Sequence, residues 1–340
     1  MRLAATTVVR NVPADVSSGR LIILEVSNER TRVVEEVRLS ENPYRSRDLN
    51  PRGGTRGLRA VAFCGDRIVV ADATRVLSLD GSRAVTSELS HPWLGLIHAV
   101  LPDPDGVWVV STSADAVVRL DWSGEVVGVV RPVDLADIVE ALGLPSADPL
   151  SAGRFDDPSA LQGRPHGLTH LNCAILTSDA MIVGLGRALV RDRAGQAALD
   201  AYRQGNWTAP PGSWRARHAI VRVPFASLAN DPPAVLWQQP VATMPGHEVW
   251  LEGRRIWTID SGGSALIAIE DSRQVGRIPV AGSFPRGLVD LGAGLVVVAT
   301  QHPLTVHIID LATGRTVGSH PLASDEDESI TCLTRCPEGW

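Results

Sequence analysis

One block of about two dozen residues recurs along the chain at intervals of about 40 residues. Residues 98–121 (HAVLPDPDGVWVVSTSADAVVRLD) align without a gap on residues 247–270 (HEVWLEGRRIWTIDSGGSALIAIE). Residues 59–80 match the same block after a two-residue deletion, and residues 286–311 repeat it once more. A repeat of this length indicates similar supersecondary units that bury their apolar faces against one another.

Each unit consists of short β-branched runs, such as RIVVAD (67–72) and GLVVVAT (294–300), separated by Gly, Asp, Asn and Pro. This pattern is typical of strands and turns rather than of helices. Four such strands fit in each unit, which is the pattern of a β-propeller blade. The units begin near residues 57, 95, 166, 245 and 284, which predicts five blades.

The two ends of the chain supply a sixth blade. Residues 3–9, 20–27 and 31–39 are predicted to form three strands, and residues 329–336 (SITCLTRC) the missing inner strand. Sharing a blade between the termini closes the ring and removes an exposed sheet edge. We therefore expect an all-β fold, a six-bladed β-propeller that spans residues 1–340 as a single domain, with its first blade closed by the C-terminal strand. The alternatives, a β-sandwich and a solenoid, do not explain the three-plus-one division of strands.

Two insertions interrupt the repeat around the fourth blade. Residues 132–165 contain a predicted helix (VDLADIVEALGL) and precede an inner strand, whereas residues 188–216 lie between a second and a third strand. Propeller connections of these two types emerge on the same face, and long loops in compact domains often carry function. We expect both insertions to cover one face, with Trp207 and Trp214 as walls of a substrate site. The alternative is that they only decorate the rim.

A polar residue marks the beginning of the inner strand in each repeat. The aligned position holds, in chain order, Arg59, His98, Asn172, His247 and Arg286, and His170 points to the same side of its strand as Asn172. Because inner strands line the central channel of a propeller, these six side chains are expected to meet around one axis.

Such a ring suits a small anionic molecule. Arg59 and Arg286 are candidate bidentate donors to a carboxylate, phosphate or sulfate group, and Asn172 is a further candidate for substrate binding. The same ring could instead be filled by ordered water, because inward polar groups need partners.

The three histidines leave the chemistry open. His98, His170 and His247 are candidate catalytic residues because imidazole exchanges protons near neutral pH. Three imidazoles with an open position also form a metal site suited to Zn, Fe or Mn, although no H-x-H or H-E-x-x-H motif supports one here. Structural histidines held by neighbouring backbone are the third alternative.

Composition removes several classes of function. The chain has 38 acidic and 32 basic residues, a formal charge of −6, so it lacks the basic excess that nucleic-acid binding needs. All the basic residues are Arg, so no lysine can form a Schiff base. No G-x-S-x-G, phosphate-loop or dinucleotide motif occurs in the required context.

The cysteines and the N-terminus predict a cytoplasmic protein. Cys64, Cys173, Cys332 and Cys336 form no C-x-x-C motif and lie in or beside apolar runs, as buried reduced thiols do. The N-terminal segment has no continuous apolar region typical of a secretory signal, and no apolar run approaches the length of a membrane span.

Three stretches carry a resemblance to a known family. They are HLNCAILTSDAMIVGLG (170–186), MPGHEVWLEGRRIWTIDSGGSALIAIE (244–270) and SFPRGLVDLGAGLVVVAT (283–300). In order and spacing they are similar to a family of bacterial six-bladed propeller proteins of unknown function, over about residues 95–300. The sequence departs from the family pattern at 245–249, where GHEVW replaces HSPRW. The resemblance implies a central site at His98, His170, Asn172, His247, Arg286 and Gly287.

Together these features predict an enzyme that acts on a small anionic or carbonyl-bearing metabolite at a central channel lined by His and Arg. Lyase, isomerase or cyclase chemistry fits better than attack by a Ser or Cys nucleophile, and a divalent metal is one candidate cofactor. The alternative is a non-catalytic propeller that binds a ligand or a protein partner.

Overall fold

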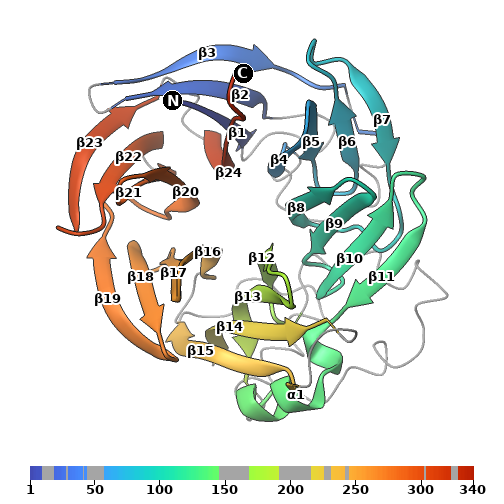
Figure 1. Cartoon of the computed structure of the whole chain (residues 1–340), viewed down its shortest axis with the longest axis vertical. Helices are drawn as coiled ribbons and strands as arrows, with labels where there is room; N and C mark the ends of the chain where they lie inside the picture. Colours follow the sequence, from blue (N-terminus) through green and yellow to red (C-terminus); the bar gives the residue numbers. More distant parts are fainter. Residues whose placement is uncertain are drawn as a thin grey trace.

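Six four-stranded antiparallel sheets stand around a common axis and form a six-bladed β-propeller, as predicted (Figure 1). The computed structural model describes residues 1–9, 19–27, 30–40, 42–43, 57–144, 168–190, 216–225, 231–241, 245–301, 304–322 and 328–340.

The first blade joins the two ends of the chain. It contains β1 (Arg2–Val9), β2 (Leu21–Val26), β3 (Thr31–Val37) and, as its innermost strand, β24 (Glu328–Arg335). β24 pairs antiparallel with β1, from Leu3 opposite Arg335 to Val9 opposite Glu328. The predicted closure of the ring by the C-terminal strand is therefore confirmed.

The other five blades follow in chain order, each from its inner to its outer strand. Blade 2 contains β4 (Ala60–Cys64), β5 (Arg67–Ala71), β6 (Val76–Leu79) and β7 (Val85–Leu89); blade 3, β8 (Ile97–Asp103), β9 (Gly106–Ser111), β10 (Ala116–Asp121) and β11 (Val126–Val130); blade 4, β12 (Leu171–Leu176), β13 (Ala180–Leu189), β14 (Ala216–Pro224) and β15 (Ala234–Val241). Blade 5 contains β16 (His247–Glu252), β17 (Arg255–Asp260), β18 (Ala265–Glu270) and β19 (Arg273–Pro279); blade 6, β20 (Arg286–Gly292), β21 (Leu295–Gln301), β22 (Leu304–Asp310) and β23 (Arg315–Pro321).

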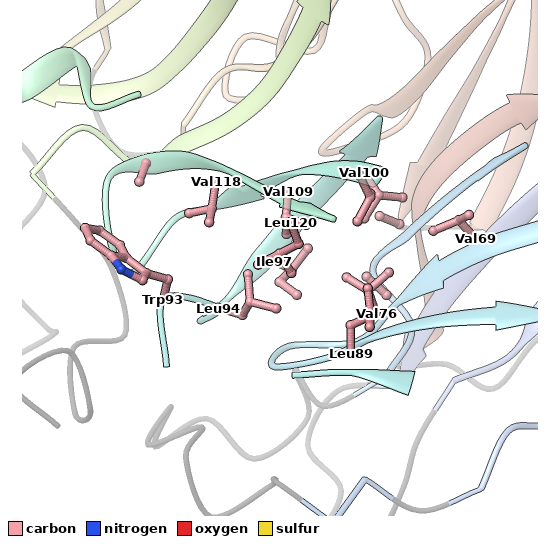
Figure 2. Packing of buried hydrophobic residues seen from close by; sticks show 14 of the residues in the cluster. Val69, Val76, Leu89, Trp93, Leu94, Ile97, Val100, Val109, Val118 and Leu120 are labelled. Carbon is pink, nitrogen blue, oxygen red and sulfur yellow. The ribbon is translucent and has the colours of Figure 1, made fainter. Parts of the chain in front are cut away.

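A cluster of buried aliphatic residues fills each interface between neighbouring blades. Figure 2 shows the cluster between blades 2 and 3, where Val69 and Val76 face Ile97, Val109 and Val118. The middle strands are covered on both faces, which explains their continuous apolar runs. Each fully buried Val, Leu or Ile contributes about 1.5–3 kcal/mol, so the six interfaces hold the ring together.

The outer strands end each sheet with an irregular edge. Every outer strand has one extra residue relative to its neighbour: Val34, Thr86, Val127, Leu236, Val275 and Val317. Such bulges twist the strand and interrupt the row of free backbone groups, which protects the edge from pairing with another chain.

The predicted helix of the first insertion is present but shorter than expected. A 3-10 turn (Pro132–Asp134) precedes α1 (Ala136–Leu142), which ends at Gly143 in the left-handed conformation. Ile138 and Leu142 of α1 are buried against blades 3 and 4. No helix in the described ranges is long and apolar enough to span a membrane.

The remainder of both insertions, residues 145–165 and 191–215, lies outside the described residues, together with Trp207 and Trp214. The position of these segments over one face therefore stays a prediction.

Candidate functional site

Five of the six inner strands carry one extra residue near the centre of the ring. These residues are His98, Asn172, Glu248, Gly287 and Thr331, each skipped by the pairing with the neighbouring strand. A bulge leaves its residue out of the ladder and re-aims the side chain. Local backbone geometry therefore sets these positions apart from the blades that support them.

The three predicted histidines converge although they belong to blades 3, 4 and 5. The ring centroid of His98 lies 5.2 Å from that of His170, edge to face, and 6.2 Å from that of His247, nearly parallel. The His170 and His247 centroids are also 6.2 Å apart. His170 and His247 are buried, and His98 is half-buried. His98 is therefore the most accessible imidazole of the cluster.

Two predicted arginines reach the same histidines from blades 2 and 6. Arg59 Nη1 lies 3.4 Å from His98 Nε2, and Arg286 Nη2 lies 2.5 Å from His247 Nε2. Both arginines are buried. The Arg286 guanidinium also lies over the Phe284 ring, 5.0 Å from its centroid, in a cation–π arrangement.

His247 is held on both sides of its ring. Its Nδ1 lies 2.7 Å from the Ser261 hydroxyl, which donates to the carbonyl oxygen of Pro285 at 2.9 Å. Its Nε2 receives the Arg286 contact already described. Ser261 was not predicted as a site residue, because its only sequence signal is its place in the turn after β17.

Asn172 links two blades. Its Nδ2 donates to the Gly246 carbonyl oxygen at 2.5 Å, and the Gly246 N–H donates to the Gly186 carbonyl oxygen at 2.9 Å. The Asn172 Oδ1 has no hydrogen-bond partner within the described ranges. The side chain predicted to bind substrate thus has its amide nitrogen engaged in joining blades 4 and 5.

Glu248 is an acidic member of this centre that the sequence analysis did not select. It is the bulged residue of β16, is half-buried, and has a left-handed backbone with φ of 56°. Burial raises the pKa of Glu248 to about 7, although the Arg286 charge and the Gly287 N–H act to lower it. The signal in the sequence was an acidic residue directly after the candidate His247 in a mainly apolar strand.

Gly287, which the resemblance places in the central site, meets a steric requirement. Its φ is 67°, and a Cβ at this position would lie 2.8 Å from Leu333 Cγ of β24. Glycine therefore allows β20 to approach the C-terminal strand closely.

A further histidine, His218 of β14, is fully buried. Its Nε2 lies 3.3 Å from the Thr258 hydroxyl, and its ring packs edge-on against Trp237. Burial lowers the pKa of His218 to about 4, so this side chain is neutral at physiological pH. These contacts are those of a structural histidine.

The histidine cluster does not fit a metal ion as it is arranged. Within the described ranges no group of three or more His, Cys, Asp or Glu side chains is placed to hold one. A metal ligand must offer a lone pair, and the lone pair of His247 Nε2 accepts a hydrogen bond from Arg286. A three-histidine site would need this contact to break.

All four cysteines are free thiols, as predicted. Cys173 and Cys336 are buried, and Cys64 and Cys332 are half-buried. Burial raises the pKa of Cys332 to about 12, so this thiol is not a nucleophile at neutral pH.

The solved structures that resemble this chain do so distantly. No family model matches the chain, and no curated protein matches it. Among solved structures, a streptogramin B lyase is similar with a TM-score of 0.48 and 10% identity, over 80% of this chain and 71% of that one.

Two further solved structures are similar at a comparable level. A catalytically inactive virginiamycin B lyase from Staphylococcus aureus, with quinupristin, has a TM-score of 0.46 and 11% identity over 82% of this chain and 74% of its own. The computationally designed Ika8 protein has a TM-score of 0.42 and 10% identity, over 94% of this chain and 75% of its own. Similarities at this level say nothing about the chemistry of this chain.

Proposed function

We propose that this protein is an enzyme that acts on a small anionic or carbonyl-bearing metabolite at the centre of the ring. The main support is that three imidazoles from three different blades converge, with ring centroids 5.2–6.2 Å apart. Two arginines from two other blades lie beside them. Such a set combines groups that move protons with groups that bind negative charge.

His98 is the acid/base group in this proposal. It is the least buried of the three rings, and its contact with Arg59 is long, at 3.4 Å. The nitrogens of His247 are held more closely, by Ser261 at 2.7 Å and by Arg286 at 2.5 Å. Removal of a proton next to a carbonyl group would generate an enolate, and a guanidinium is suited to stabilise that charge. Some reactions of the lyase, isomerase and cyclase types begin with this step.

Exchange of carbon-bound hydrogen in D2O tests the proposal. The protein is incubated with a panel of small carboxylates, keto acids and phosphate esters, and NMR follows loss of the proton signal next to the carbonyl group. We expect exchange or product formation for one chemical class, reduced about 100-fold or more in His98→Gln. His320→Gln, on the outer strand β23, is the matched control. A His98→Gln variant that folds normally and keeps full activity would overturn the role of His98.

Arg59→Met and Arg286→Met test the anchoring groups. The arginine that binds the anionic group of the substrate should, when replaced, mainly raise KM, whereas the arginine that stabilises the enolate should mainly lower kcat. Two variants with wild-type KM and kcat would contradict both roles. The measurement is steady-state kinetics on the substrate found in the panel, with melting temperatures as a check on folding.

Binding without turnover is the second candidate function. One observation favours it: the Asn172 amide nitrogen and both His247 nitrogens already bond to protein groups. These contacts restrict the movement of the two side chains. A ligand that is retained in native mass spectrometry, is released unchanged and takes up no deuterium would assign the protein to this class.

A further inference from the structure

A closed loop of hydrogen bonds links the side chain of Arg286 to the peptide that precedes it. Arg286 Nη2 contacts His247 Nε2 at 2.5 Å, and His247 Nδ1 contacts the Ser261 hydroxyl at 2.7 Å. Ser261 then donates to the carbonyl oxygen of Pro285, the residue before Arg286, at 2.9 Å. The loop crosses from blade 6 to blade 5 and back.

The chemistry of these groups fixes the position of each proton. A guanidinium can only donate, so Nε2 of His247 must accept and carries no hydrogen. The neutral ring then bears its proton on Nδ1, which donates to Ser261. The Ser261 hydroxyl hydrogen points to the Pro285 carbonyl, which can only accept. Every donor in the loop has one acceptor.

Packing around the loop restricts movement of the ring. His247 and Ser261 are 3% and 2% exposed, so water does not readily replace either contact. The Phe284 ring lies edge-on to His247 with centroids 5.3 Å apart, and the His98 ring stacks nearly parallel to it. Two aromatic rings therefore lie near the imidazole, in addition to its two hydrogen bonds.

We propose that Ser261 is a positioning residue that holds His247 as a neutral imidazole with its proton on Nδ1, and that His247 in this form aims the Arg286 guanidinium at the centre of the ring. His247 is thus a support for an anion-binding arginine rather than a proton-transfer group. Only the ligand of Arg286 depends on the function proposed above; the protonation pattern does not.

Long-range proton–nitrogen NMR of protein labelled with ¹⁵N-histidine tests the pattern directly. The His247 signals are assigned by their loss in His247→Gln. In the wild type we expect one protonated nitrogen, Nδ1, and one unprotonated nitrogen, Nε2. Free neutral histidine exchanges its proton between both positions, so a single fixed form requires the contacts described.

Variants at Ser261 separate positioning from a merely structural effect. Ser261→Ala removes the acceptor of the Nδ1 proton, and the two nitrogen signals should broaden or move toward each other. Ser261→Thr keeps the hydroxyl and should restore the wild-type pattern. Melting temperatures report whether the variants fold. If neither Ser261 variant folds, the spectrum of the wild type still tests the proposal. A proton on Nε2 of His247, or on both of its nitrogens, would overturn it.

Inorganic sulfate, titrated by calorimetry, tests the consequence for Arg286. We expect Ser261→Ala to weaken sulfate binding about tenfold, the value of one lost hydrogen bond of about 1.4 kcal/mol, and Ser261→Thr to bind as the wild type does. The expected NMR pattern with no sulfate binding in any protein would remove the anion-binding function and leave the positioning role. Equal binding by the wild type and Ser261→Ala would remove the aiming of Arg286.

Discussion

Arg20 forms a two-point ion pair with Glu328, with both nitrogen–oxygen distances at 2.8 Å. Arg20 precedes β2, and Glu328 begins β24, so this pair joins the two ends of the chain inside the first blade. Glu328 also accepts a hydrogen bond from the Thr7 hydroxyl at 2.7 Å, and its side chain is 3% exposed. The ring is therefore closed by charge as well as by strand pairing.

Removal of Arg20 should weaken this closure. Arg20→Met leaves the buried Glu328 carboxylate without its ionic partner, and we expect the free energy of unfolding to fall by about 3 kcal/mol in urea denaturation. Arg32→Met is the matched control, because the Arg32–Glu25 pair is exposed and lies on the same blade. Its loss should cost less than about 1 kcal/mol. Similar losses in both variants would show that Glu328 is solvated.

The raised pKa of Glu248 predicts a pH dependence of stability. The pKa rises from 4.5 to about 7, so between these values the folded protein holds a proton that the unfolded chain releases. This contribution to stability is complete below pH 4.5. It is lost as pH rises toward the folded-state value of about 7.

Glu248→Gln provides the comparison. The free energy of unfolding of the wild type relative to this variant should fall by at most about 3 kcal/mol across that window. The measurement is urea denaturation of both proteins at several pH values. Parallel curves would mean that the carboxyl group titrates normally.

The backbone of Gly246 leaves no room for a side chain. A Cβ there would lie 2.1 Å from His218 Nδ1, and no positive φ strains the residue. Gly246→Ala should therefore destabilise the protein by about 2–3 kcal/mol, through overpacking alone. In a His218→Ala background the same change should cost less than about 1 kcal/mol, which a double-mutant cycle measures. Gly81→Ala, with open space around it, is the control.

Asp115 should control the placement of His170. Its buried carboxylate accepts hydrogen bonds from the Thr169 N–H at 2.9 Å, from the Thr169 hydroxyl and from the Leu168 N–H. Asp115→Ala leaves these donors unsatisfied, and we expect a loss of about 2–3 kcal/mol with a displaced His170 NMR signal. Asp115→Asn keeps one acceptor oxygen, so it should lower the stability less and displace the His170 signal less than Asp115→Ala does. An unchanged His170 signal in Asp115→Ala would contradict the prediction.

The sequence predicted the blades because their determinants are local. Apolar runs such as VWVVS and turns such as DGS specify strands without reference to distant residues. The terminal blade was also predictable, since five complete units leave three strands at one end and one at the other. The histidines and arginines of the centre followed from their repeated place at the start of the inner strands.

The details of the centre were not predictable, because they depend on contacts between blades. A gapless alignment places His98 and His247 at the same position, yet the bulged residues are His98 and Glu248. An extra residue leaves no mark in the composition of a strand. The Ser261 contact likewise depends on the distance between β17 and the segment before β20, which no sequence pattern encodes.

The bulges of the inner strands separate two tasks of the chain. Residues on either side of each bulge maintain strand pairing, while the bulged residue contributes no rung to the ladder. A substitution there changes the chemistry at the axis without breaking a pairing that holds a sheet together. Except at Gly287, where a Cβ would meet Leu333, the side chains at these bulged positions can therefore differ while the paired strands around them stay the same.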